Sequence, residues 1–310
     1  MFLLAPAKIN LTLRILSKRP DGYHEISSLM RAIRLFDELA VTISFAEDGV
    51  IQEPVIRVSA DAPGVPDGPG NLAYRAAALA LETWGCSAKS GLDGRVRFIR
   101  YVGIGLKKNI PMAAGLAGGS ADAAAVLLGL SKELNPAATL SELAALGAAL
   151  GADVPFCVYS CAASNPVFGF EGAVAALVGG AGELITPRSN PGRAQVVLVK
   201  PSMEIRASEA YALYDTMVAR GVSSRGSDND LEAPCARAWP IVAETLEKLK
   251  NICAEAGAGG AKVQLSGSGP TVFAYFEEKP SEKSGETAAR VYDLAKTAFH
   301  GMFVHLTDLC

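Results

Sequence analysis

A glycine-rich segment at residues 112–120, MAAGLAGGS, is the part of the chain whose composition is best suited to chemistry. It runs directly into residues 121–130, ADAAAVLLGL, which are good helix formers. Glycine lets the backbone approach a ligand closely, and the free N–H groups and dipole at the start of a helix attract anions. The pattern therefore indicates a phosphate cradle, although a close contact between packed helices explains the small residues equally well.

This loop does not supply the positive charge that a bound phosphate needs. It lacks the Gly-Lys-Ser or Gly-Lys-Thr ending of a Walker loop, and it does not match the G-x-G-x-x-G pattern. The charge would have to come from a metal ion or from a lysine elsewhere in the chain. Asp122, in the first helical turn, would repel phosphate if it pointed inward, so we expect it to face away or to help hold a metal.

Three other segments carry functional groups, and each also has a simpler structural explanation. Lys8 and Asn10 share one face of a predicted strand, where a lysine is most often solvated. Asp153 follows a helix end and precedes a stiff Val-Pro pair, a setting typical of a turn or capping aspartate. Residues 266–270, SGSGP, either line a ligand or make a tight turn.

The histidines fall in different settings. Tyr23 and His24 follow an Asp-Gly turn, and such an aromatic pair suits base stacking, although a single loop histidine is usually a surface residue. We assign structural roles to His300 and His305. No histidine pairs with Cys or Glu at the spacing of a zinc site, so no structural or catalytic zinc is expected.

Alternation with a period of two predicts a strand over residues 4–16 whose second face is unusually polar. The other predicted elements mix without a regular βαβ alternation, which favours layered α+β architecture over a doubly wound sheet. Further strands are expected at 39–45, 55–59, 95–103, 195–200, 262–265 and 271–276, and a polar loop at 221–230. Helices are expected at 71–84 with Asn71 as N-cap, 121–130, 139–150 with a Thr139–Glu142 capping box, 208–220, 241–256 and 288–299.

Composition limits the class of protein. The chain has 310 residues, room for about two domains, and 29 basic against 32 acidic residues give a net charge of −3. Without a basic block there is no electrostatic support for binding to nucleic acid or to an anionic membrane. We expect a soluble protein without a membrane span or secretory signal, and six cysteines without a C-x-x-C pair are expected to be reduced thiols in the cytoplasm.

Taken together, three motifs in this order resemble those of the GHMP kinases: APAKINL at 5–11, PMAAGLAGGSADA at 111–123 and LSGSGPTVF at 265–273. Two more, RPDGYHE at 19–25 and GADVPF at 151–156, are similar to one branch of that superfamily. Kinases of this branch phosphorylate the 2-hydroxyl of 4-(cytidine 5′-diphospho)-2-C-methyl-D-erythritol in the non-mevalonate pathway to isoprenoids. The resemblance covers nearly the whole chain.

The resemblance implies two α+β domains, residues 1–187 and 188–310, the first resembling a ribosomal-protein domain and the second ferredoxin-like, with the active site in the cleft between them. It implies that Asp153 is the general base for the 2-hydroxyl and that Lys8 keeps this carboxylate ionised and stabilises the developing charge. ATP and Mg²⁺ would be held at the glycine-rich loop, with Ser120 as a candidate ligand of magnesium or phosphate. The loop residues expected to bind ATP are Pro111, Met112, Ala113, Ala114, Gly115, Leu116, Ala117, Gly118, Gly119, Ser120 and Ala121.

The same resemblance implies that Asn10, Tyr23 and His24 recognise the cytidine end of the substrate, while Tyr211 stacks on the opposite face of the base. The expected partner is thus a small molecule, not a nucleic acid or a membrane, and the chain is expected to be a monomer or a weak homodimer. In a plastid-bearing organism the expected location of the protein would be the plastid stroma instead of the cytoplasm, after removal of a transit peptide.

Two departures from the branch's pattern are visible. The chain carries about a dozen extra residues around 164–179, and Ala207 stands where the branch often has threonine. One alternative is another small-molecule kinase of the superfamily, such as homoserine or mevalonate kinase, but the Tyr-His pair argues against it. The other is a non-catalytic ATP-binding regulator, which would have no need of a base such as Asp153 beside Lys8.

Overall fold

The computed structural model describes residues 1–46, 53–89, 96–189, 192–222, 226–277 and 284–310. Of the predicted elements, Arg95 and residues 223–225 lie outside these ranges. In the part of the chain so described, no helix combines the length and apolarity needed to cross a membrane.

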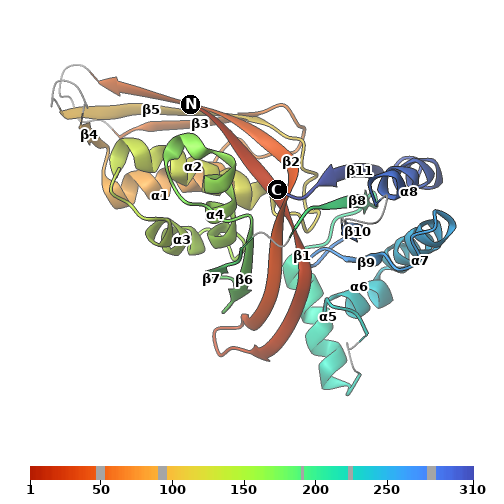
Figure 1. Ribbon diagram of the computed structural model, residues 1–310. Helices are drawn as coiled ribbons and strands as arrows, with labels where there is room; N and C mark the ends of the chain where they lie inside the picture. The colour runs from red at the N-terminus through yellow and green to blue at the C-terminus, as the bar shows by residue number, and fades with distance from the viewer. Residues whose placement is uncertain (47–52, 90–95, 190–191, 223–225, 278–283) are drawn as a thin grey trace.

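The first part of the chain builds a seven-stranded sheet with helices on one face (Figure 1). Five strands lie in the order β3-β5-β2-β6-β7, β1 pairs with β2, and β4 pairs with β5. The strands are β1 (Phe2–Lys18), β2 (His24–Ala46), β3 (Val55–Ala60), β4 (Ser87–Lys89), β5 (Val96–Lys107), β6 (Ala175–Gly179) and β7 (Leu184–Pro187). The helices are α1 (Leu72–Trp84), α2 (Gly118–Leu134), α3 (Leu140–Ala148) and α4 (Val154–Ser164), followed by the short 3₁₀ helix η1 (Pro166–Phe168).

The second part builds a four-stranded antiparallel sheet in the order β11-β8-β10-β9. In chain order the unit is strand, helices, two strands, helix, strand, so the ferredoxin-like arrangement and the α+β class are confirmed. Its strands are β8 (Ala194–Lys200), β9 (Lys262–Leu265), β10 (Val272–Glu277) and β11 (Phe303–Asp308). Its helices are α5 (Ala207–Ala219), α6 (Glu232–Ala238), α7 (Pro240–Glu255) and α8 (Ser284–Ala298).

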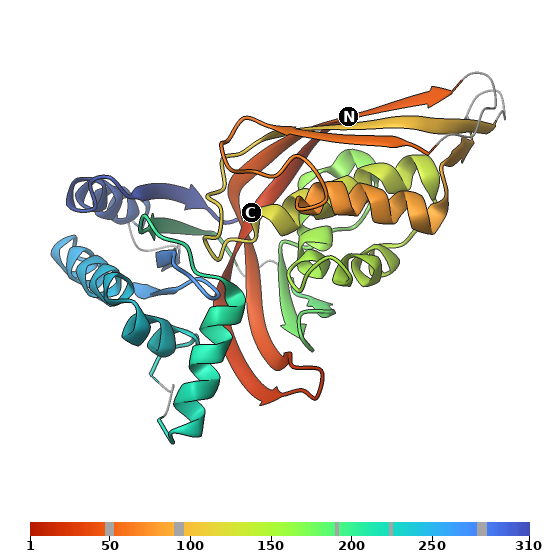
Figure 2. The same ribbon diagram turned by 180° about the vertical axis from the view of Figure 1, so that it is seen from behind.

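The two units share one buried apolar layer. Helices α7 and α8 cover one face of the smaller sheet, and the other face packs against the β1–β2 hairpin, which lies between the units (Figure 2). The end of the chain also contacts this hairpin: Leu309 forms a bridge with Ile33, and the Cys310 N–H donates to the Ala32 carbonyl at 3.1 Å. The shared layer consists of Ala7, Ile9, Leu11, Ile33, Leu35, Ile110, Ala114, Leu116, Ala194, Val196, Leu198, Phe273 and Leu309.

Local signals predicted several elements correctly. Asn71 caps α1 by accepting a hydrogen bond from the Ala73 N–H at 2.8 Å, and the Thr139–Glu142 capping box begins α3. Strand β2 is much longer than the predicted 39–45. Buried positions in its first half hold polar residues such as His24, Ser28 and Arg31, so no apolar alternation marks this half in the sequence. Helix α4 was not predicted, and it contains Cys157 and Cys161, which are buried as expected of cysteines in an apolar segment.

A buried ion cluster anchors the glycine-rich segment to the large sheet. The Lys108 ammonium donates to the carboxylates of Asp37, on β2, and Asp122, on α2. Asp37 also accepts from the N–H groups of Asn109 and Ile110, at 2.7 and 2.8 Å. Burial raises the pKa of Asp122 to about 7, because two carboxylates share a single lysine away from water. The cluster therefore fixes where the glycine-rich loop begins.

Replacing Asp37 by alanine should destabilise the fold by about 3–5 kcal/mol, because Lys108 loses a buried partner and the buried Ile110 N–H loses its acceptor. Urea unfolding of wild type and Asp37→Ala measures this loss. The matched control is Glu38→Ala, since the half-exposed neighbouring carboxylate pairs with Lys107 at the surface and its removal should cost less than about 1 kcal/mol. Equal losses in the two variants would contradict the anchoring role.

Candidate active site

Lys8 brings three distant segments together. Its ammonium group is 2.7 Å from Asn10 Oδ1, 3.1 Å from the Gly115 carbonyl and 3.7 Å from Asp153 Oδ2. The lysine is almost fully buried, at 3% exposure, so it is not the solvated strand residue that is the commoner case. The structure thus places β1, the glycine-rich loop and the start of α4 around one buried cation.

Asp153 is not a capping residue, although that is the better interpretation of its local sequence. It occupies the N-cap position of α4, but its side chain makes no capping hydrogen bond and instead pairs with Lys8. Its side chain remains one-third exposed and lines a cavity. A carboxylate held beside a buried ammonium, with one edge open to a cavity, is suited to accept a proton from a bound hydroxyl.

The cavity next to Asp153 has a volume of about 500 Å³ and lies between the two units. One wall is formed by the glycine-rich loop and the start of α2, and the other by residues of the smaller unit. This size is in the usual range for a small-molecule site. Two lining residues are cations, Lys108 and Arg206, and the sequence analysis singled out neither. The lining residues of the smaller unit are Ile205, Arg206, Ala207 and Ser268.

The glycines of the loop serve different purposes. A Cβ on Gly115 would lie 2.2 Å from the Ser266 carbonyl, and one on Gly118 would lie 3.0 Å from the Ile110 side chain. At these two positions glycine is needed because neighbouring residues pack against the backbone, not because a ligand approaches it. Gly119 is exposed and would meet only Leu72, at 3.6 Å, so its backbone faces open space.

The loop is also strained where helix α2 begins. Ala113 and Ala117 have positive φ values of 47° and 60°, which are uncommon for a residue with a Cβ and tend to cluster at functional sites. Helix α2 begins at Gly118, three residues before the predicted start, and Ala121 is the first to bond back to Ala117. The earlier N–H groups of this turn lack helical acceptors and lie at the cavity, where an anion can bind them.

The predicted substrate residues lie in two places. Asn10 is fully buried beside Lys8, and its Nδ2 group donates to Ser28 Oγ at 2.8 Å. His24 lies at the other end of the hairpin, where its ring stacks on Tyr211 with centroids 4.8 Å apart. Tyr23 is 62% exposed. Burial raises the pKa of Tyr211, and the negative charge of Asp153 adds to the rise.

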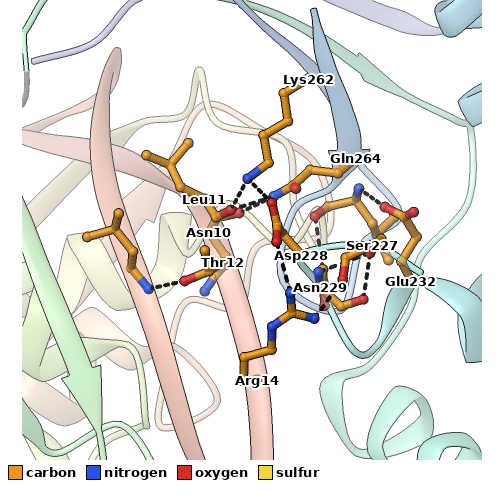
Figure 3. Close-up of polar contacts among 12 residues, drawn as sticks. Asn10, Leu11, Thr12, Arg14, Ser227, Asp228, Asn229, Glu232, Lys262 and Gln264 are labelled. Carbon is orange, nitrogen blue, oxygen red and sulfur yellow. Dashed lines mark hydrogen bonds and ion pairs between the residues drawn. The ribbon is translucent and has the colours of Figure 1, made fainter. Parts of the chain in front are cut away.

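A polar junction attaches the smaller unit to β1, and no signal in the sequence predicted it (Figure 3). Gln264 Nε2 and Lys262 Nζ donate to the backbone carbonyls of Asn10 and Leu11, each at 2.7 Å. Asn229 Nδ2 donates to the carbonyls of Leu265 and Gly267, so it holds the loop that touches Gly115.

The loop before α6 completes this junction. Arg14, on β1, pairs with Asp228 at 2.8 Å (Figure 3). Arg14 also pairs with Asp230 at 3.0 Å, and the Leu13 N–H donates to the Asp228 carbonyl at 2.7 Å. An Asp-Asn-Asp run is typical of any turn, so the sequence offers no signal that this loop pairs with a strand more than two hundred residues earlier.

The apparent extra segment around 164–179 packs over α4. Asn165 is buried and joins the loop to β1, accepting from the Leu4 N–H at 2.9 Å and donating to the Leu4 carbonyl at 2.8 Å. The Lys132 ammonium lies 3.8 Å from the centre of the Phe170 ring. The segment contributes no lining residue to the 500 Å³ cavity.

Comparison with known proteins agrees with this geometry. The family model "GHMP kinases N terminal domain" matches residues 71–161, and "GHMP kinases C terminal" matches residues 226–296. A 4-diphosphocytidyl-2-C-methyl-D-erythritol kinase of Geobacillus thermodenitrificans is 39% identical over 289 residues, covering 88% of this chain and 87% of the relative. The enzyme of the same name from Geobacter sp. strain M21 is 36% identical and covers 93% and 92% of the two chains.

Solved structures extend the comparison. A crystal structure of 4-(cytidine 5′-diphospho)-2C-methyl-D-erythritol kinase matches with a TM-score of 0.65 and 30% identity, over 100% of this chain and 99% of the other. Homoserine kinase from Cytophaga hutchinsonii has a TM-score of 0.64 but only 17% identity, over 100% and 94% of the two chains, so it shares the fold alone. The chain therefore belongs to the 4-diphosphocytidyl-2-C-methyl-D-erythritol kinase family of the GHMP kinases.

Proposed function

We propose that this chain transfers the terminal phosphoryl group of ATP to the 2-hydroxyl of 4-(cytidine 5′-diphospho)-2-C-methyl-D-erythritol, a step of non-mevalonate isoprenoid biosynthesis. The observation that carries the proposal is the Lys8–Asp153 pair at the edge of a cavity walled by the glycine-rich loop. A cytoplasmic location and a monomer or weak homodimer fit a metabolic kinase of this kind.

Asp153 acts as the general base in this proposal. Its exposed edge accepts the proton of the substrate hydroxyl, while the buried Lys8 ammonium favours the ionised carboxylate and stabilises the alkoxide that develops. Residues 111–121 hold the ATP phosphates through the backbone N–H groups at the start of α2. Phosphoryl transfer depends mainly on positioning and charge neutralisation, and this arrangement provides both.

The residues present are suited to Mg²⁺. Asp122 Oδ1 is buried and has no hydrogen-bond partner among the described residues, and Ser120 lines the same cavity. Magnesium prefers hard oxygen ligands and usually binds one or two protein groups together with substrate phosphates. Ser120 and Asp122 would hold the ion, which when bound neutralises charge on the phosphates.

The two parts of the chain divide the work. Residues 1–187 would bind ATP and supply the base, and residues 188–310 would complete the substrate site. Tyr23 and His24 would bind the cytosine base with Tyr211 from the smaller unit. Asn10, which was expected at the cytidine end, lies beside Lys8, and this position favours a contact with the methylerythritol end instead.

Substrate choice tests the proposed activity. A coupled assay of ADP release should show turnover with the cytidine substrate and at most background with homoserine, mevalonate and galactose. The physical reason is that His24 and Tyr211 form a base-binding end that these small acceptors cannot occupy. Faster turnover of homoserine or mevalonate than of the cytidine substrate would refute the assignment.

Asp153→Asn should lower kcat by at least about 100-fold, since general-base catalysis typically contributes 10²–10⁴. The Kd for ATP, measured by calorimetry, should remain near the wild-type value because the amide preserves the shape of the site. Glu244→Gln, an exposed change on α7, is the control and should leave kcat unchanged. Near-normal turnover by Asp153→Asn would rule out its role as base.

Tyr211→Ala should raise KM for the cytidine substrate by about 5- to 100-fold, because a stacked base contributes on the order of 1–3 kcal/mol. The Kd for ATP should not change. Tyr211→Phe keeps the aromatic face and should behave like wild type in steady-state kinetics. A variant with weakened ATP binding but an unchanged KM for the cytidine substrate would show that Tyr211 is wrongly placed.

A further inference from the structure

The ring of His24 is held on several sides. It is only 8% exposed, it stacks on Tyr211 at an interplanar angle of 21°, and it meets the edge of Tyr214 with centroids 6.2 Å apart. Both tyrosines belong to α5, and so does Asp215, which follows Tyr211 by one helical turn and therefore lies on the same face. The smaller unit thus sets both the plane of this ring and its polar contact.

Each oxygen of the Asp215 carboxylate has a different partner. Oδ1 is 2.7 Å from His24 Nε2, and Oδ2 accepts from the Lys18 ammonium at 2.5 Å. Lys18 and His24 face each other across the β1–β2 hairpin, so the carboxylate joins both strands to α5. Burial alone would raise the pKa of Asp215, but the hydrogen bonds from Lys18 and His24 outweigh it and hold the pKa below its usual value.

An ionised carboxylate can only accept hydrogen bonds, so His24 Nε2 must carry the proton in this contact. In a neutral imidazole the other nitrogen, Nδ1, is then an acceptor. Nδ1 has no hydrogen-bond partner in the part of the chain that the structure describes. The free edge of His24 is therefore prepared to receive a donor group from a ligand.

We propose that Asp215 is a specificity-determining positioning residue: by fixing His24 in the Nε2–H tautomer, it makes the site select a pyrimidine with an exocyclic amine over one with a carbonyl at that position. The proposal rests on the proposed function, in which His24 contacts the base. Cytosine presents an amine there, whereas uracil presents a carbonyl oxygen, which would leave both acceptors unpaired.

The tautomer can be measured in the free protein, without substrate. The chain has three histidines, so ¹⁵N-histidine NMR gives few signals, and a His24→Gln variant assigns those of His24. At about pH 8, the wild-type spectrum should show His24 with Nε2 protonated and Nδ1 unprotonated. In Asp215→Asn the amide can donate as well as accept, so both tautomers should be populated.

Kinetics then test the consequence. We expect wild type to prefer the cytidine substrate over its uridine counterpart by about 10- to 100-fold in kcat/KM, the usual effect of leaving a buried polar group unpaired. Asp215→Asn should reduce this ratio by at least about tenfold, mainly through KM, while kcat for the cytidine substrate changes little. Lys18→Met is the matched control: it removes the other partner of Asp215 but leaves the contact with His24, and should preserve the ratio.

The outcomes separate this proposal from the proposed function. Wild-type His24 protonated on Nδ1, or on both nitrogens, would overturn the role of Asp215. An Asp215→Asn enzyme that loses activity equally on both substrates would also overturn it, because that result indicates a purely structural contact. Absence of turnover on the cytidine substrate by wild type would instead refute the proposed function, whatever the tautomer.

Discussion

The burial of one ammonium group, that of Lys8, constrains the rest of the site. Removing a cation from water costs several kcal/mol unless oxygen atoms surround it. Here these oxygens come from β1 and from two segments more than a hundred residues later, the glycine-rich loop and the start of α4. None of the three can move without leaving the charge poorly compensated, so the same interaction that keeps Asp153 beside the cation also fixes the wall of the cavity.

The cleft is held rigid by two kinds of contact between the units. An apolar layer joins the smaller sheet to the β1–β2 hairpin, and beside it Gln264, Lys262 and Asn229 bond to backbone carbonyls on β1 and in the 266–270 loop. The apolar layer supplies burial, and the polar contacts set the register, because the donors reach particular carbonyls, those of Asn10 and Leu11 on β1. In the proposed function, residues of both units can then bind the base, while Lys8 and Asp153 both belong to the larger unit.

The sequence predicted what local rules determine. Asn71 and the Thr139–Glu142 box were identified as caps, and the glycine-rich loop as the start of a helix, because these signals lie within a few residues. For Asp153 and Lys8, local rules indicated the wrong role. They favoured a helix cap for Asp153 and a solvated surface position for Lys8, whereas the two residues pair with each other and Lys8 is buried. Their pairing was expected only from the resemblance to GHMP kinases. The junction around Asn229 was missed because the contacts that join this loop to β1 and to residues 265–267 are distant in sequence.

The contact between the last residues and β2 has a consequence for biosynthesis. Cys310 bonds to Ala32, which lies opposite Lys8 in the hairpin, and Leu309 belongs to the apolar layer shared by the units. The hairpin leaves the ribosome early, yet these contacts require residues more than 270 positions later in the chain. The nascent chain must therefore leave this part of β1 and β2 uncovered until residues 309 and 310 have emerged from the ribosome.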